Sequence, residues 1–294
     1  MTDSSQNEIF LGADAQDVGI ENSKVAILSA PFEATVSYGS GTSKGPRSII
    51  EASSQVELYD EELDLEPYRV GIYTHPTIDF DGLSVEASLE RIGNSVSELI
   101  KSGKKVLMLG GEHSVTAPSV KAHHEVHPEF TVLQFDAHAD LKEEYQGSPH
   151  SHASVMARVR EMVPAVQVGM RSLNADEARI IKAKEYPLFY AYAIRKNKNW
   201  IQDVIKSIRT KKVYVTLDID VFSSSIMPAT GTPEPGGLDW YEVTALLKEV
   251  GEKFDVIGAD LVELAPIDGL IATDFLAAKL AYKMIGYFWA TNSK

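Results

Sequence analysis

Acidic and histidine side chains follow several of the apolar segments that the sequence predicts to be strands. Alternate residues of a strand point to the same face, so acids and histidines two positions apart are expected to project together. Several ionisable groups at one end of a buried sheet cost free energy unless a cation compensates them. The pattern therefore predicts a metal site. Its expected ligands come from three separate segments of the chain and are His113, Asp136, His138, Asp140, Asp218 and Asp220.

The charges of these six side chains favour two divalent cations over one. The four aspartates supply four negative charges, and the two histidines are neutral donors. In sites of this kind two ions lie about 3.5–4 Å apart and share bridging carboxylates. Oxygen and imidazole ligands suit Mn²⁺, with Co²⁺, Fe²⁺ and Zn²⁺ as open alternatives. The chain has no cysteine, which disfavours a structural zinc held by thiolates.

The elements that must position these residues form an alternating series. Apolar runs rich in β-branched residues predict strands at 25–31, 69–74, 106–111, 131–138, 165–171, 187–192, 212–220 and 255–263. Helices are expected at 46–53, 83–102, 118–127, 152–160, 175–183, 198–210, 239–252 and 273–288. Nearly continuous apolar strands between helices predict an α/β fold with three layers, α/β/α, and a mostly parallel central sheet of about eight strands.

No linker, repeat or low-complexity tract divides the chain, so residues 1–294 are expected to form a single domain. Two long irregular segments, 142–151 and 221–237, directly follow strands that end in acids. Ligands of parallel sheets gather at the carboxyl ends of the strands. We therefore expect these two loops to form the walls of the site.

The overall charge narrows the range of partners. Lys and Arg total 28 against 42 Asp and Glu, which gives a net charge of −14. Nucleic acids and anionic membranes bind through basic patches, so neither is an expected partner, whereas a cationic substrate would be attracted. The first residues lack the features of a signal peptide, and charges interrupt the apolar segment 270–290, which is expected to be a docked helix rather than a membrane span. A cytoplasmic location is therefore predicted.

Six sequence blocks together resemble the ureohydrolase family, which comprises arginases, agmatinases and related hydrolases of guanidino compounds. The blocks are SYGSGTSKGPRSIIEAS (37–53), GGEHSVT (110–116), FDAHADL (135–141), LDIDVF (217–222), ATGTPEPGG (229–237) and ADLVELAP (259–266). The resemblance implies an arginase-like fold, a binuclear metal centre and assembly into homo-oligomers, as trimers or hexamers. Within the family the chain looks most like an agmatinase.

The resemblance also implies a distribution of ligands between the two ions. One ion would be held by His113, Asp136, Asp140 and Asp218. The second would be held by Asp136, His138, Asp218 and Asp220, so that Asp136 and Asp218 bridge the pair. This agrees with the charge count of the six side chains.

A guanidinium group is always protonated and its carbon is a poor electrophile. Two metal ions would make hydroxide available between them near neutral pH, and its attack would lead to urea and an alkylamine. The amine leaves badly unless it is protonated. The resemblance assigns this proton transfer to His152, with His150 as the weaker alternative, and it assigns pairing with the guanidinium to Glu263. Asp140 counts as catalytic as well as a ligand, and Thr232 lies beside the bound group or serves the turn.

The loop after the FDAHADL block is expected to select the substrate. Where arginases carry an asparagine and a serine for the α-carboxylate and α-amine, this chain has Lys142, Glu143, Glu144 and Tyr145. Glu143 and Glu144 would repel a carboxylate and attract a second cationic end. We therefore predict cleavage of agmatine to urea and putrescine, a step of polyamine biosynthesis. The sequence does not distinguish agmatine from aminopropyl-agmatine, which is the alternative substrate. Guanidinobutyrate and arginine are disfavoured.

Two rival functions are compatible with part of these residues. A deacetylase-like enzyme with one metal, or a binding protein without turnover, would use part of the same residues. The segment of His123, His124 and His127 is expected to face solvent on a helix. Asp260 is expected to orient a loop, and Arg171 to support the acid-rich site. Ser223 and Ser224 stand where the family commonly continues toward a further acid, which puts the rigidity of that loop in question.

Overall fold

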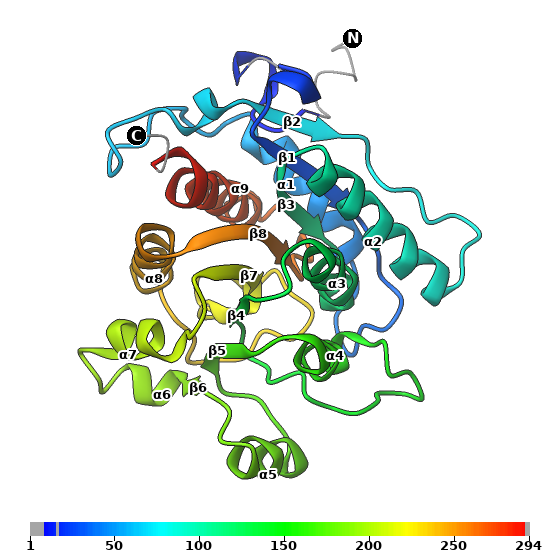
Figure 1. Cartoon of the computed structure of the whole chain (residues 1–294), viewed down its shortest axis with the longest axis vertical. Coiled ribbons are helices and arrows are strands. Elements are labelled where there is room, and N and C mark those ends of the chain that lie inside the picture. Colours follow the sequence, from blue (N-terminus) through cyan, green and yellow to red (C-terminus); the bar gives the residue numbers. More distant parts are fainter. Residues whose placement is uncertain (1–8, 16–17, 292–294) are drawn as a thin grey trace.

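The computed structural model describes residues 9–15 and 18–291 of the chain, and its core is one sheet of eight strands. The strands follow the order β2-β1-β3-β8-β7-β4-β5-β6, and every neighbouring pair is parallel (Figure 1). The strands are β1 (Val25–Ala30), β2 (Ile72–His75), β3 (Lys105–Gly110), β4 (Thr131–Phe135), β5 (Ala165–Met170), β6 (Leu188–Tyr190), β7 (Lys212–Asp218) and β8 (Asp255–Val262). The predicted parallel α/β fold is confirmed.

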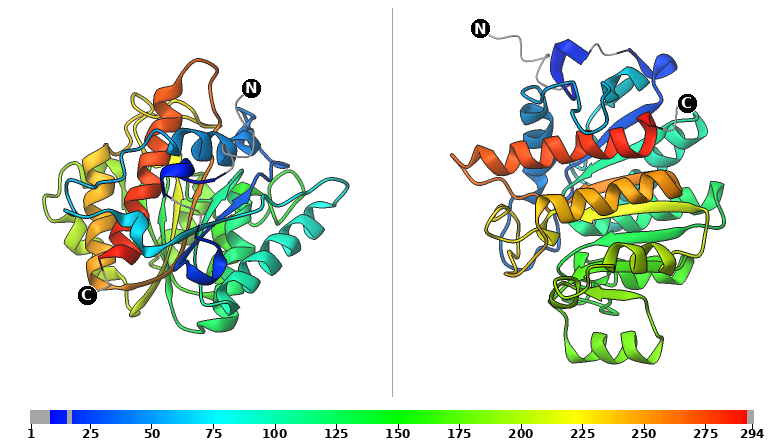
Figure 2. Two further views of the ribbon diagram at one scale, coloured as in Figure 1. Left: turned by 90° about the horizontal axis from the view of Figure 1, so that it is seen from above. Right: turned by 90° about the vertical axis from the view of Figure 1, so that its left-hand side faces the viewer.

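Helices cover both faces of this sheet, as the view from above in Figure 2 shows. One face carries α1 (Gly45–Ser53), α7 (Trp200–Ser207), α8 (Trp240–Lys253) and α9 (Ile271–Ile285), which continues as a π-helical turn at Gly286–Ala290. The other face carries α2 (Val85–Lys101), α3 (Thr116–Val126) and α4 (Val155–Met162). The helices α5 (Ala175–Ala183) and α6 (Ala191–Ile194) lie at the β5–β6 end of the sheet (Figure 1).

The central strands are buried along almost their whole length because helices shield both of their faces. All six residues of β1 and all five of β4 are buried, and so are the last six residues of β7. Their side chains are mainly Val, Leu, Ile, Ala and Phe, which explains why these strands read as continuous apolar runs rather than as an alternating pattern. Four neighbouring strands, β3, β8, β7 and β4, form the middle of the sheet. Residues that follow their carboxyl ends are therefore anchored to buried strands.

Three local expectations were wrong. The strand β4 ends at Phe135, so Asp136, His138 and Asp140 lie in the loop that follows it rather than along a continuing strand. His123 does not face solvent, because α3 turns it into the core, where it is fully buried against Tyr214 with ring centroids 4.9 Å apart. The segment 187–192 is not a strand throughout, because β6 ends at Tyr190 and the short helix α6 begins at Ala191.

The last helix packs into the protein, as expected for the segment 270–290. Its buried face includes Ala277, Leu280 and Ala281, and it lies against α1 and α8. Across the described residues, none of the helices combines the length and the apolar character that crossing a membrane requires.

A partly buried group of charges is tied to this helix, and we call it the lysine cluster: Asp60, Glu62, Lys248, Lys283 and Tyr287. The Lys283 ammonium lies 2.9 Å from Asp60 Oδ1 and 3.1 Å from Glu62 Oε2. Lys248 contacts the other oxygen of Glu62 at 3.1 Å, and the hydroxyl of Tyr287 donates to Glu62 Oε2. Each carboxylate of the lysine cluster therefore has a cation from the chain itself.

Candidate active site

The predicted metal ligands come together where three central strands end. His113 follows β3, Asp136, His138 and Asp140 follow β4, and Asp218 closes β7. Asp220 lies in the 3-10 turn Ile219–Val221 directly after β7, and its backbone N–H donates to Asp218 Oδ1 at 2.8 Å. These strands are neighbours or near neighbours in the sheet, so their ends bring the six side chains to one place. We call these six residues the acid–histidine cluster.

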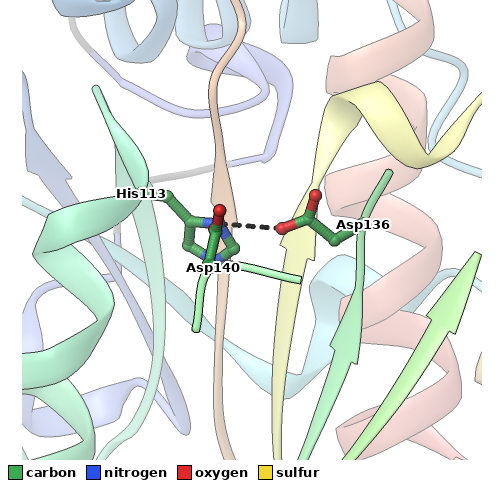
Figure 3. Close-up of side chains that lie close together, drawn as sticks. All are labelled: His113, Asp136 and Asp140. Carbon is green, nitrogen blue, oxygen red and sulfur yellow. Dashed lines mark ion pairs between the residues drawn. The ribbon is translucent and has the colours of Figure 1, made fainter. Parts of the chain in front are cut away.

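The ring of His113 is surrounded by carboxylates on one side (Figure 3). Its Nδ1 lies 3.1 Å from Asp136 Oδ2, 3.2 Å from Asp140 Oδ2 and 3.5 Å from Asp218 Oδ2. The other nitrogen, Nε2, contacts the hydroxyl of Thr216 at 2.8 Å. Although burial opposes protonation, the three carboxylates raise the pKa of His113 well above its ordinary value. A positive charge next to His113 Nδ1 would therefore be stabilised by these three carboxylates.

A second set of ligand atoms lies on the other side of Asp136. His138 Nδ1 is 2.8 Å from Asp220 Oδ2 and 3.5 Å from Asp136 Oδ1. Asp136 belongs to both groups, His113–Asp136–Asp140 and Asp136–His138–Asp220, and in each group the ligand atoms lie within 4.8 Å of one another. One shared carboxylate between two triads is the arrangement that a pair of bridged cations requires.

These residues fit divalent cations by their chemistry. His113 Nδ1 is buried and makes no hydrogen bond although it faces three carboxylates. Among residues 9–15 and 18–291, no lysine or arginine forms an ion pair with Asp136, Asp140 or Asp218. Buried carboxylates without a cationic partner are costly, so the cluster is built for charge that a ligand brings. Oxygen and imidazole donors suit Mn²⁺ and similar ions.

The pKa values of three site acids are raised, whereas His113 and His138 lower that of Asp136 although burial opposes the shift. Burial and the neighbouring Asp136 raise the pKa of Asp140 to about 7. Burial, followed by the charges of Asp220 and Asp136, raises the pKa of Asp218 well above its ordinary value. Burial is also the main cause that raises the pKa of Glu263 to about 8. A bound cation would reverse these upward shifts, because it favours the ionised form of each carboxyl.

Two site residues adopt a backbone conformation that non-glycine residues seldom use. Asp140 has φ of 52° and Glu263 has φ of 66°. Such residues in the left-handed region cost free energy and persist where the surrounding structure holds them, often at functional sites. The Glu263 carboxylate accepts the backbone N–H of His113 at 2.6 Å, which ties the two strand ends together.

A cavity of about 290 Å³ opens beside the acid–histidine cluster. His152, Thr232 and Glu263 line it together with His113, His138, Asp140, Asp218 and Asp220. The two other acids predicted to bind substrate do not line it. Glu143 is exposed and paired with Arg158 at 3.0 Å, and Glu144 is exposed. His150 lines a different groove, between α2, α3 and α4.

The loop 221–237 is held by Arg171, as expected for a residue that supports the site. Its guanidinium donates to the carbonyl oxygens of Asp220 at 2.6 Å and Glu234 at 2.9 Å, at either end of this loop. The hydroxyl of Ser223 contacts that of Ser225 at 2.9 Å within a turn, so the serines give the loop local hydrogen bonds. Asp260 accepts from Thr116 at 3.0 Å and from Tyr214 at 2.7 Å behind His113.

Several residues near the cavity were missed by the sequence analysis. Glu177 is buried and lines the cavity, where its two oxygens accept the backbone N–H groups of Leu141 and Asn174. The sequence signal was the N-A-D-E capping box that opens α5 after the end of β5. Glu112 and Thr35 were also missed: Glu112 contacts Thr35, and Thr35 contacts His152. No pattern in the sequence pairs positions so far apart.

Comparison with known proteins agrees with this geometry. The model of the arginase family matches residues 23–286. This chain belongs to the arginase family. The predicted ureohydrolase membership is therefore confirmed, and so is the prediction of an enzyme of this type, a hydrolase of amidine C–N bonds. The family depends on binuclear metal centres, and the His/Asp groups of this arginase-family chain match that requirement.

Individual relatives cover nearly the whole chain of this arginase-family member. The N(1)-aminopropylagmatine ureohydrolase of Synechocystis sp. is 41% identical over 277 residues, 92% of this chain and 90% of that protein. The agmatinase of Bacillus anthracis is 34% identical over 270 residues, 90% and 92% of the two chains. The solved structure of the agmatine ureohydrolase of Thermoplasma volcanium has a TM-score of 0.87 at 28% identity and covers 98% of this chain and 97% of that chain.

Proposed function

We propose that this chain hydrolyses the guanidino group of a decarboxylated, agmatine-type amine to urea and a polyamine. The observation that carries the proposal is the pair of His/Asp triads that share Asp136, next to a cavity lined by His152 and Glu263. When bound, two divalent cations would supply the positive charge that ionises water at neutral pH. The six residues of the acid–histidine cluster would hold them, with Asp136 between the two.

Glu263 has the position and chemistry to orient the guanidinium. Its carboxylate lines the cavity, and the backbone N–H of His113 fixes one of its oxygens. A planar guanidinium donates pairs of parallel hydrogen bonds to a carboxylate, which would hold the reacting carbon beside the metal ligands. Thr232 lines the same cavity and would border the bound group. Asp140 would serve as a metal ligand and thereby as a catalytic residue.

His152 is the proposed proton donor to the leaving amine. Its ring lines the cavity and is partly buried. Burial lowers the pKa of His152 below its ordinary value, so the ring gives up a proton readily. An alkylamine has a pKa of about 10 and leaves easily only when a proton reaches its nitrogen as the C–N bond breaks.

The amine end of the substrate needs a negative wall, and the geometry favours Glu177 over the predicted pair Glu143 and Glu144. Glu177 is a buried carboxylate on the cavity wall, whereas Glu143 is engaged by Arg158 outside it. Lys142 also lines the cavity, but its ammonium lies 4.4 Å from the centre of the Tyr145 ring, a cation–π contact. We keep Glu143 and Glu144 only as an untested prediction.

Agmatine and N(1)-aminopropylagmatine are the two candidate substrates. The 41% identity to a relative named for aminopropylagmatine, against 34% for a relative named agmatinase, favours the longer amine. The loop that lacks the arginase-type asparagine and serine favours either amine over arginine. We further propose Mn²⁺ as the metal, a homo-oligomer as the assembly, a cytoplasmic location and a role in polyamine biosynthesis.

A substrate panel tests the proposal. Urea release would be measured with agmatine, N(1)-aminopropylagmatine, arginine and guanidinobutyrate, each with Mn²⁺, Co²⁺, Fe²⁺ or Zn²⁺. We expect the two amines to exceed arginine by about 100-fold or more in kcat/KM, because a site lacking contacts for the carboxylate leaves that charge unpaired. Equal or better turnover of arginine would overturn the choice of substrate, and no urea from any compound would overturn the activity.

A further inference from the structure

A buried carboxylate that plays no part in the proposed reaction directly precedes His113. Glu112 has none of its surface exposed. Within the described residues, four donors contact it, and all of them are uncharged. They are the backbone N–H groups of Ala34 and Thr35, both at 2.6 Å, and the hydroxyls of Thr35 at 2.7 Å and Ser114 at 2.6 Å. A buried charge without a cation costs free energy, so the contacts of Glu112 suggest a functional role.

The hydroxyl of Thr35 has its direction fixed by Glu112. A carboxylate accepts hydrogen bonds and has no proton to give, so the single hydroxyl proton of Thr35 points to Glu112 Oε1. The hydroxyl oxygen of Thr35 lies 3.1 Å from His152 Nδ1 and 3.1 Å from the backbone nitrogen of His152. Toward both of these atoms Thr35 must act as an acceptor.

This direction fixes the tautomer of the His152 ring. Because Thr35 accepts, His152 Nδ1 must carry the hydrogen, and in the neutral ring Nε2 then carries the lone pair. Nε2 lies 2.7 Å from the hydroxyl of Ser37, and both residues line the cavity. The nitrogen that exchanges protons is therefore the one on the cavity side.

We propose that Glu112 and Thr35 are positioning residues that hold His152 in its Nδ1–H tautomer and stabilise its protonated form, an inference that rests on the proposed function. With a proton on Nε2, the imidazolium keeps its Nδ1–H bond to Thr35, whose hydroxyl is bonded to the Glu112 anion. That proton passes to the leaving nitrogen as the C–N bond breaks and its electron pair stays on nitrogen. The ring returns to the neutral Nδ1–H form.

The segment 112–113 links both halves of the site in this arrangement. Glu112 acts on the ring of His152 through Thr35, and the next residue, His113, belongs to the acid–histidine cluster. The loop that follows β1 supplies Thr35 and Ser37, one for each nitrogen of the His152 ring. A substitution at Thr35 thus reaches the proton donor without touching a metal ligand.

The kinetic test replaces Thr35 in the Mn²⁺-loaded enzyme. Thr35→Val keeps the shape and removes the hydroxyl, and we expect kcat for urea release to fall about 10- to 100-fold, part of the about 10²–10⁴-fold that a positioned proton donor provides. KM and the manganese content per chain should stay unchanged, and Thr35→Ser should recover most of kcat. Thr244→Val, which removes a hydroxyl bonded to the Trp240 carbonyl in α8, is the matched control and should leave kcat unchanged.

A wild-type kcat in Thr35→Val, or a Thr35→Ser variant as slow as Thr35→Val, would overturn the inference. So would a rise in KM that accounts for the whole loss, because that would show a binding role. Glu112→Gln is the second variant, and it should reduce kcat in the same direction as Thr35→Val.

A measurement independent of activity separates this inference from the proposed function. ¹⁵N NMR of the diamagnetic Zn²⁺-loaded protein should show the neutral ring of His152 protonated at Nδ1, and Thr35→Val should shift population to Nε2–H. An Nε2–H tautomer in the unaltered protein would overturn the inference even if the enzyme releases urea. If no guanidino compound yields urea while His152 is protonated at Nδ1, the proposed function fails and the positioning stands.

Discussion

The acid–histidine cluster and the lysine cluster both contain buried carboxylates, but their negative charge is balanced in opposite ways. In the lysine cluster, Lys283 and Lys248 lie within 3.1 Å of the oxygens of Asp60 and Glu62. The neighbours of these acids include a tyrosine hydroxyl, and the contacts lower the pKa of Glu62 to about 2 although burial opposes the shift. The chain balances this charge itself.

The acid–histidine cluster has no such internal balance. Only imidazole rings approach its carboxylates within ion-pair distance in the described part of the chain, and the pKa values of Asp140 and Asp218 are raised. A fold that merely needed stability would not assemble these groups, since unpaired buried charges are destabilising. The comparison thus distinguishes carboxylates that are paired within the fold from carboxylates suited to binding a cationic ligand.

The largest expected effect is the loss of activity when one site carboxylate is neutralised. In Asp218→Asn the side-chain oxygen can still accept the Asp220 N–H, and the new amide would face His113 Nδ1. We expect kcat/KM for urea release to fall about 10³-fold, the equivalent of several kcal/mol of metal-derived stabilisation. The stability in chelator should stay equal or rise. Asp255→Asn, at the surface pair with Lys105, is the control. Activity retained in Asp218→Asn would break the comparison.

The opposite result is expected in the lysine cluster. Lys283→Met removes a cation that is 3% exposed and leaves Asp60 buried without it. Removing one partner of a buried pair costs about 3–5 kcal/mol. Because Glu62 is partly exposed, we expect a loss of about 3 kcal/mol in the free energy of unfolding. Urea denaturation measures it. Lys253→Met, at the surface pair with Glu249, should change stability by less than about 0.5 kcal/mol. An unchanged midpoint in Lys283→Met, or weakened Mn²⁺ binding, would contradict the separation.

Metal addition should stabilise the protein through one cluster only. At a free Mn²⁺ concentration 100 times its dissociation constant, one bound ion adds about 2.7 kcal/mol to the free energy of unfolding. Thermal denaturation with and without chelator measures the shift. The increment should persist in Lys283→Met and shrink in Asp218→Asn. An increment of the same size in both variants would mean that the metal binds elsewhere.

The smallest expected effect concerns pH. The folded pKa of Glu62 is about 2, below the ordinary value of 4.5, so its contribution to stability is present above about pH 4.5 and is lost as the pH falls toward 2. More than a third of the Glu62 side chain is exposed, which limits the contribution to at most about 1 kcal/mol. The difference in unfolding free energy between wild type and Glu62→Gln, followed from pH 6 to 2.5, should shrink on acidification. A gap that widens would show the wrong sign.

The sequence predicted the sheet and the clustering of the six candidate ligands because both follow from local patterns. Continuous apolar runs marked β3, β4, β7 and β8, and acids or histidines two positions apart marked the ends of β4 and β7. The end of β4 was misplaced, because Asp136 continues the apparent alternation although the strand has already ended at Phe135. His123 was misjudged for a related reason: a polar side chain at a buried helix position carries no local sign of its burial.

The contacts that join distant segments were beyond the reach of local patterns. Glu112 and Thr35 are 77 positions apart, and Thr35 and His152 are 117 apart. Likewise, the sequence of residues 142–145 does not indicate that Glu143 pairs with Arg158 outside the cavity. It also does not indicate that Glu177 lines the cavity. The cavity wall depends on such tertiary contacts, so the sequence predicted the reaction class better than the residues that line the cavity.

The stoichiometry of metal binding tests the central claim most directly. Chelator-treated protein would be titrated with Mn²⁺ in a calorimeter, and the result checked by metal analysis of the desalted complex. The two triads that share Asp136 predict two ions per chain, with Asp218→Asn losing at least one of them. One ion per chain, or none, in the unaltered protein would contradict the account of paired cations in the acid–histidine cluster.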